Sequence, residues 1–104
     1  MDDKWWCATI IICSSVIDEE DGRTLCDEQI YLLKADDLES ATKKAAEIGK
    51  RQEHSYESIQ GQTVYWRFVG LQNVNELSDQ DIVDGSEIRS KLVRVADPRI
   101  LLDG

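Results

Sequence analysis

The chain has 104 residues, of which 12 are lysine or arginine and 21 are aspartate or glutamate, giving a formal net charge of −9 at pH 7. This length predicts one domain with a single modest core, and 41% hydrophobic residues in regular patterns exclude the disordered class. The negative charge repels nucleic acids and anionic membrane surfaces, and it favours a basic protein partner.

The first predicted element is a strand over residues 5–17, WWCATIIICSSVI. The run is apolar and rich in β-branched residues without a polar phase, which is typical of a central strand covered on both faces. It lacks the positive flank and cleavage site of a signal peptide, and it is too short to cross a membrane as a helix. We therefore expect no export signal and no membrane contact.

A hairpin follows from this strand. Residues 18–24, DEEDGRT, contain turn-forming aspartates and Gly22, and residues 25–35, LCDEQIYLLKA, resume the alternation of a strand. The predicted hairpin spans residues 5–35, and its tip carries the acidic side chains of Asp18, Glu19, Glu20 and Asp21.

A one-sided helix is predicted from Asp37 to Arg51. Apolar residues recur there at helical spacing, while lysines and glutamates take the other side. Asp36 or Asp37 can cap the start, and basic residues near the end suit the helix dipole. The small alanines on the apolar side would let this helix lie close to a sheet.

The second half of the chain predicts further strands. Residues 55–60 and 62–71 flank Gly61 and form a second predicted hairpin, with Gly70 as a candidate bulge. Residues 86–95, SEIRSKLVRV, alternate like a last strand.

Residues 73–85 are polar and predict a loop with one helical turn. The predicted fold is α+β: an antiparallel sheet of about five strands with one amphipathic helix on one face, in the order strand, strand, helix, strand, strand, strand. We expect a single domain over residues 1–104, with a core at 5–96 and a C-terminal tail at 97–104.

Strand parity predicts which side chains face the helix, because alternate residues point to opposite faces. The predicted helix-facing residues are apolar: Ile30, Leu32, Val64, Trp66, Phe68, Ile88 and Leu92. The opposite, open face is predicted to be more aromatic and basic, with Tyr31, Leu33, Tyr65, Arg67, Arg89 and Lys91.

The sequence leaves three alternatives for what contacts the open face. A homodimer, or the C-terminal segment with Ile100, Leu101 and Leu102, would bury it as exposed apolar patches are usually buried. Its aromatic and arginine side chains could instead stack on single-stranded bases, although the net charge opposes that encounter. The face could also contact another protein.

No catalytic or metal motif is present in the sequence. His54, the only histidine, has no partner that the sequence reveals, and the spacing of the acidic residues in DQDIVDGSE fails the calcium-loop pattern. We expect no enzyme activity, cofactor or metal. The odd number of cysteines, Cys7, Cys13 and Cys26, without a C-x-x-C pair predicts buried reduced thiols and hence a cytoplasmic location.

Several features together resemble a family of small bacterial proteins catalogued as domain of unknown function 4288. They are the Trp5-Trp6 opening of the first strand, the helix end AAEIGKRQEHSY, the hairpin SYESIQGQTVYWRFVGL and the later DGSEI. The most specific element is G-x-x-V-x-W-x-F within the hairpin. The resemblance implies this domain outline, and it implies no reaction, cofactor or catalytic residue.

Small acidic proteins without a catalytic motif are often inhibitors, such as immunity proteins that neutralise cationic nuclease toxins. By this analogy we expect a protein-binding module for a basic partner such as a toxin domain. The alternative is a non-enzymatic accessory protein that binds nucleic acid or a ligand through its open sheet face. The predicted partner-binding residues are Asp18, Glu19, Glu20, Asp21, Asp79, Asp81, Asp84 and Glu87 in acidic loops, with Tyr65 and Arg67 on the open face.

Overall fold

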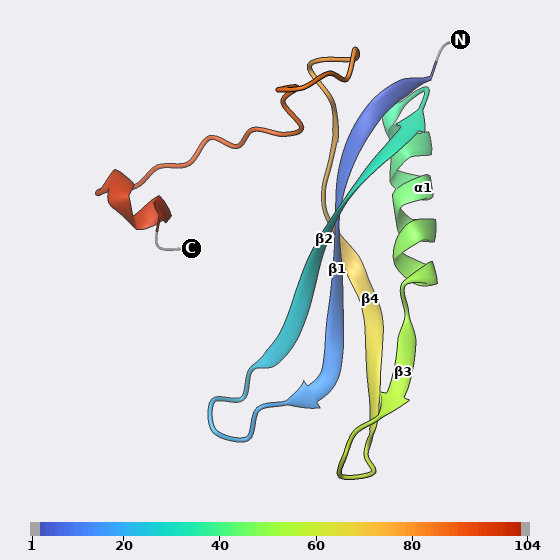
Figure 1. Cartoon of the computed structure of the whole chain (residues 1–104), viewed down its shortest axis with the longest axis vertical. Helices are drawn as coiled ribbons and strands as arrows, with labels where there is room; N and C mark the ends of the chain where they lie inside the picture. Colours follow the sequence, from blue (N-terminus) through green and yellow to red (C-terminus); the bar gives the residue numbers. More distant parts are fainter. Residues whose placement is uncertain (1–2, 103–104) are drawn as a thin grey trace.

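A computed structural model describes residues 3–102 as an α+β fold with four antiparallel strands and one α-helix. The elements in chain order are β1 Lys4–Ile17, β2 Thr24–Ala35, α1 Leu38–Arg51, β3 His54–Glu57, β4 Thr63–Glu76 and a short 3-10 helix, η1 Pro98–Leu102. The strands lie in the order β2-β1-β4-β3, and α1 packs on one face of the curled sheet (Figure 1). The predicted fold class is confirmed, with four strands in place of about five.

β1 is one of the two inner strands of the sheet, as its unbroken apolar run predicts. Cys7, Ala8 and Ile10 have no exposed surface, and β2 and β4 pair with β1 on either side. The pairing with β4 is irregular near Gly70, as predicted: Ile11 lies opposite Gly70 and the next residue, Ile12, lies opposite Phe68.

The core lies between the sheet and the apolar side of α1. Its buried cluster consists of Trp6, Ala8, Leu33, Ala35, Ala41 and Ala45. The indole Nε1 of Trp6 donates to the carbonyl of Ala35 at 2.8 Å, so the one polar atom of this buried ring is satisfied. The helix begins after Asp37, whose carboxylate accepts a hydrogen bond from the Ser40 amide at 2.8 Å.

The predicted face assignment of β2 is wrong. Leu33 is only 4% exposed in the core beneath α1, whereas Ile30 is 60% exposed on the opposite side. Leu33 lies directly opposite Trp6, and residues paired in this way share a face, so Tyr31 also belongs to the helix side and Leu32 to the open face. Near the end of β2, apolar side chains point to both faces of the sheet, so strand parity alone could not decide which face lies under the helix.

The predicted fifth strand over residues 86–95 does not form. The chain is irregular there, and Arg89 Nη1 donates to Thr9 Oγ1 at 3.0 Å on the open face. Ile88 lies beside Arg89 and Thr9, not under α1, and Leu92 is fully exposed. Alternation does not by itself pair a segment with a sheet edge, and this segment lies beside the open face, where Ile88 and Arg89 are near Thr9. The loop before it begins after Glu76, where β4 ends, and not at residue 73, and it also lacks the predicted helical turn.

Residues 92–102, which we call the C-terminal arm, extend away from the sheet (Figure 1). The radius of gyration is 17.2 Å, whereas a compact chain of this length has a value of about 13 Å. Ile100, Leu101 and Leu102 in η1 are exposed and do not cover the open face.

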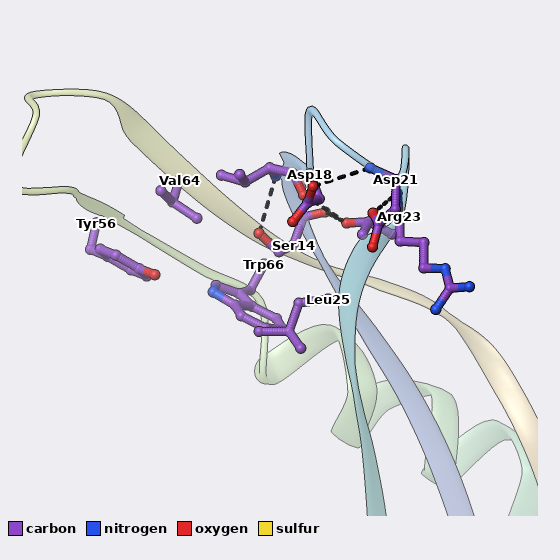
Figure 2. Close-up of a pocket in the computed structure, with 10 residues that line it drawn as sticks. Ser14, Asp18, Asp21, Arg23, Leu25, Tyr56, Val64 and Trp66 are labelled. Carbon is purple, nitrogen blue, oxygen red and sulfur yellow. Dashed lines mark hydrogen bonds between the residues drawn. The ribbon is translucent and has the colours of Figure 1, made fainter.

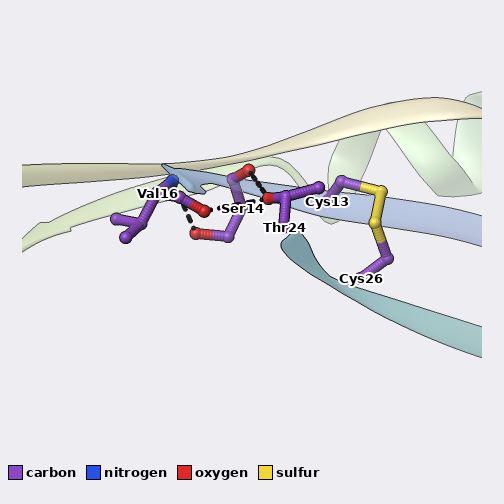
Figure 3. Close-up of a disulfide and its surroundings, with 5 residues drawn as sticks. All are labelled: Cys13, Ser14, Val16, Thr24 and Cys26. Carbon is purple, nitrogen blue, oxygen red and sulfur yellow. Dashed lines mark hydrogen bonds between the residues drawn. A yellow bond between two sulfur atoms is a disulfide. The ribbon is translucent and has the colours of Figure 1, made fainter. Parts of the chain in front are cut away.

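Cys13 and Cys26 form a disulfide, which corrects the prediction of three reduced thiols (Figure 3). The hairpin register places the two residues directly opposite each other on neighbouring strands, a relation that their separation in sequence does not reveal. Cys7 is free and buried, and burial raises the pKa of its thiol, with a smaller opposing effect from Arg89. Disulfides persist in oxidising compartments, so the cysteines no longer support a cytoplasmic location.

Candidate functional site

The predicted partner-binding residues occupy three separate places. The acidic tip from Asp18 to Asp21 ends the β1–β2 hairpin, whereas the loop with Asp79 and Asp81 lies at the opposite end of β1, where Gln80 bonds to Trp5. At about 3.3 Å per residue, the 14-residue β1 holds these two loops roughly 40 Å apart. They cannot form one contiguous surface.

Beside the hairpin tip, the structure has a groove of about 550 Å³, which we call the tip groove (Figure 2). It is lined by Ser14, Val16, Asp18, Asp21, Arg23, Thr24, Leu25, Tyr56, Val64 and Trp66. The groove exists because α1 is shorter than the strands beneath it. A 14-residue helix spans about 21 Å, whereas a 14-residue strand spans about 46 Å, so the end of this sheet face is bare.

The groove wall is apolar and aromatic. Trp66 lies opposite Ser14, and Tyr56 lies opposite Val64, so all four side chains share the helix-side face. Val64 is buried as predicted, but Trp66 is only half-buried because α1 ends before reaching it. The ring of His54 stacks on Trp66 with the ring centroids 6.2 Å apart.

The rim of the groove is the acidic tip, and its backbone is held by its own carboxylates. Asp18 Oδ1 accepts from the amides of Glu20 at 2.8 Å and Asp21 at 3.2 Å. Asp21 Oδ1 accepts from the amide of Arg23 at 2.9 Å. Gly22, with φ of +69°, takes the left-handed conformation that closes the turn. The turn therefore holds the carboxylates of Asp18 and Asp21 in place, with the exposed Glu19 and Glu20 between them.

Thr24 holds the two strands together below the tip. Its hydroxyl lies near the carbonyls of Ser14 and Val16, at 2.7 and 3.0 Å, where the strand register shifts (Figure 3). The Arg23 side chain points away from Trp66 and Tyr56, so it does not occupy the aromatic part of the groove (Figure 2). Carboxylates beside aromatic faces suit a cationic, partly apolar ligand.

The second acidic loop uses its side chains to fold itself. Asp79 accepts hydrogen bonds from the Asp81 amide at 3.1 Å and the Ser86 hydroxyl at 3.2 Å. Asp84 and Glu87 belong to the same loop region, and Asp84 is exposed. Within residues 3–102, no group of three acidic, histidine or cysteine side chains is arranged to hold a metal.

Tyr65 and Arg67 lie on the open face, as predicted. The Arg67 guanidinium sits over the Tyr65 ring at 4.9 Å from its centroid, so the two predicted contact residues pair with each other. Leu33 and Tyr31 are absent from this face, which makes it less aromatic than expected. No helix in the described part of the chain is long and apolar enough to cross a membrane.

Sequence reasoning identified the acidic tip and missed the groove beside it. His54 and Tyr56 were not predicted as parts of a surface. Two features of the sequence indicate one: both residues share a strand face with Trp66, and the predicted helix is too short to cover the whole of that face.

Comparison with known proteins identifies the family. Residues 5–90 match the family model described as a domain of unknown function, DUF4288, and the chain belongs to that family. A search of curated proteins finds no match, and a search of solved structures finds none either.

Proposed function

We propose that this DUF4288 domain is a binding module for a basic protein and that the tip groove is its binding surface. One observation carries the proposal: the fixed acidic tip borders a bare apolar wall formed by Tyr56, Val64 and Trp66. The remaining predicted acidic residues, around Asp79, lie at the other end of the sheet and contribute to the long-range field alone.

The two parts of the groove would have different roles. Exposed carboxylates act mainly on the association rate, and each surface ion pair contributes little to affinity. Partly exposed tyrosine and tryptophan side chains are typical energetic centres of protein interfaces. A basic segment would thus be attracted by Asp18 to Asp21 and retained by Tyr56 and Trp66.

An inhibitor is the kind of binding module that we favour. A toxin that binds nucleic acid must present a basic cleft, and an acidic hairpin tip could enter it and occupy its phosphate sites. This step is an analogy with immunity proteins, supported by the net charge of −9. A cytoplasmic location belongs to the same proposal, now without support from the cysteines.

The second candidate is a non-enzymatic accessory protein whose open face binds nucleic acid or a ligand. The stacked pair of Tyr65 and Arg67 favours it, because such pairs are suited to stacking on bases. The net charge opposes it, and Arg89 already crosses part of that face.

A matched pair of charge variants tests the proposal. Glu19→Gln with Glu20→Gln removes two of the four negative charges of the tip without touching the carboxylates that shape the turn. Asp84→Asn with Glu87→Gln removes the same charge at the other end of the sheet. The measured quantity is the rate of association with a basic partner recovered from cell extract at low salt. We expect the tip variant to associate more slowly than the parent and the Asp84→Asn, Glu87→Gln variant to associate at nearly the parent rate. Equal rates for both variants would refute the tip groove as the site.

A further inference from the structure

The C-terminal arm is apolar but has nothing to pack against in its own chain. Its exposed apolar residues are Leu92, Val93, Val95, Ile100, Leu101 and Leu102, and Leu92 is 102% exposed. A soluble domain rarely leaves so many large apolar side chains in one continuous segment without a partner. The arm therefore has the character of a segment that binds elsewhere.

The arm and the body of the protein carry opposite charge. The arm contains Arg94 and Arg99 against Asp97, a net charge of +1, and the rest of the chain therefore carries −10. Asp97 is bonded to Arg99 at 2.9 Å, which leaves Arg94 as the main basic group within the arm. The tip groove offers a matching surface, where Asp18 and Asp21, with Arg23 beside them, border an apolar wall.

The base of the arm lies on the wrong face to reach the groove of its own chain directly. Arg89 is bonded to Thr9 on the open face, whereas Trp66 and Val64 line the groove on the helix side, at the end of the sheet near the hairpin tip. The sheet separates the two. A second copy has no such restriction, because its groove can approach an arm that extends away from the body (Figure 1).

We propose that the C-terminal arm of one copy docks into the tip groove of a second copy, and that this exchange covers the groove until a basic partner displaces it. The apolar residues of the arm would pack on Trp66, Tyr56 and Leu25, with Arg94 facing the acidic tip. The inference rests on the proposed function in taking the same groove as the binding site. A reciprocal exchange of two arms gives a closed two-fold dimer.

Sedimentation of the full chain over a range of concentrations tests the exchange, with one variant for each side of the contact. Ile100→Asp with Leu101→Asp alters the arm, and Leu25→Asp alters a groove residue that is 69% exposed. Val69→Asp is the matched control, since Val69 is 67% exposed and lies outside both the groove and the arm. Each variant's fold is checked by circular dichroism.

We expect the parent chain and the Val69→Asp control to dimerise, and the arm and groove variants each to associate at least about tenfold more weakly. Mixing the arm variant with the groove variant should restore association, because one supplies an intact groove and the other an intact arm. A parent chain that is monomeric at every concentration would overturn the inference. So would a dimer that Val69→Asp alone disrupts, which would place the contact on the open face.

Binding of an arginine-rich peptide separates this inference from the proposed function. The arm variant, with its groove uncovered, should bind the peptide more tightly than the parent. If the parent is monomeric and still binds the peptide through the groove, the exchange fails and the proposed function stands. If arm and groove dimerise but the peptide never competes, the exchange stands and the groove is not a site for basic partners.

Discussion

Gly49 of α1 packs directly on the ring of Phe68 in β4. A Cβ placed on Gly49 would lie 2.5 Å from Cδ1 of Phe68, which is closer than carbon atoms approach without displacement. The glycine thus sets the distance between helix and sheet at the last turn of α1, next to the point where the tip groove begins.

Gly49→Ala should therefore destabilise the protein although alanine favours helices. Overpacking costs about 1–3 kcal/mol and the gain in helix propensity is about 1 kcal/mol, so we expect a net loss on the order of 1 kcal/mol in the free energy of unfolding. Gly70→Ala is the control, because a Cβ there meets nothing within 4 Å. Urea denaturation compares the two, and equal stability would show that Phe68 moves aside freely.

The Cys13–Cys26 disulfide predicts a specific thiol count. Protein denatured without reductant should carry one alkylatable thiol, that of Cys7, by mass spectrometry. Cys13→Ser should lower the free energy of unfolding by about 2–3 kcal/mol, the usual effect of opening a loop of this length. Three alkylatable thiols in protein purified under oxidising conditions would contradict the pairing.

Asp37 gives the helix a pH-dependent cap. Hydrogen bonding from Ser40 holds the pKa of Asp37 below its ordinary value of 3.8. A carboxylate with a lowered pKa stabilises the fold above its unfolded-state pKa, and this contribution is lost as pH falls through the folded-state pKa. Asp37→Asn keeps a capping oxygen without the charge.

The parent should therefore be more stable than Asp37→Asn at pH 7, and the difference should shrink as pH falls below about 4. Urea midpoints of both proteins measured from pH 7 to low pH give the comparison. A difference that stays constant with pH would show that the charge of Asp37 does not stabilise the helix.

Arg89 is expected to protect the thiol of Cys7. Both Cys7 and Thr9 are buried on the open face, where Arg89 bonds to Thr9. Arg89→Ala should loosen this covering segment and speed native-state alkylation of Cys7, while global stability measured by urea falls little. Cys7 should be alkylated more slowly in Arg89→Lys, which retains a hydrogen-bond donor, than in Arg89→Ala. Identical rates in the parent and both variants would show that Arg89 does not cover the thiol.

Local patterns predicted the elements whose signals are local. The helix from Asp37 followed from apolar spacing and a capping residue, and the central strand followed from an apolar run with no polar phase. The face of β2 did not follow, since both of its phases are apolar beside Leu33. The fifth strand failed because alternation around Arg89 does not specify pairing with an edge strand, and Arg89 bonds to Thr9 on the open face instead.

The site was predicted only in part for the same reason. Charge clustering from Asp18 to Asp21 is visible in the sequence, but the bare wall at Trp66 depends on the lengths of α1 and β4 in space. The pairing of Cys13 with Cys26 depends on hairpin register across an irregular loop, which residue spacing does not determine.

The most direct test of the tip groove compares two tyrosines of similar exposure on opposite faces of the sheet. Tyr56, in the groove, is 50% exposed, and Tyr65, on the open face, is 42% exposed. Dissociation constants of Tyr56→Ala and Tyr65→Ala for a basic partner protein should differ, with Tyr56→Ala weaker than the parent by about 2 kcal/mol, or roughly thirtyfold, and Tyr65→Ala nearly unchanged. If Tyr65→Ala loses binding and Tyr56→Ala does not, the open face is the binding surface and the proposed function of the groove is wrong.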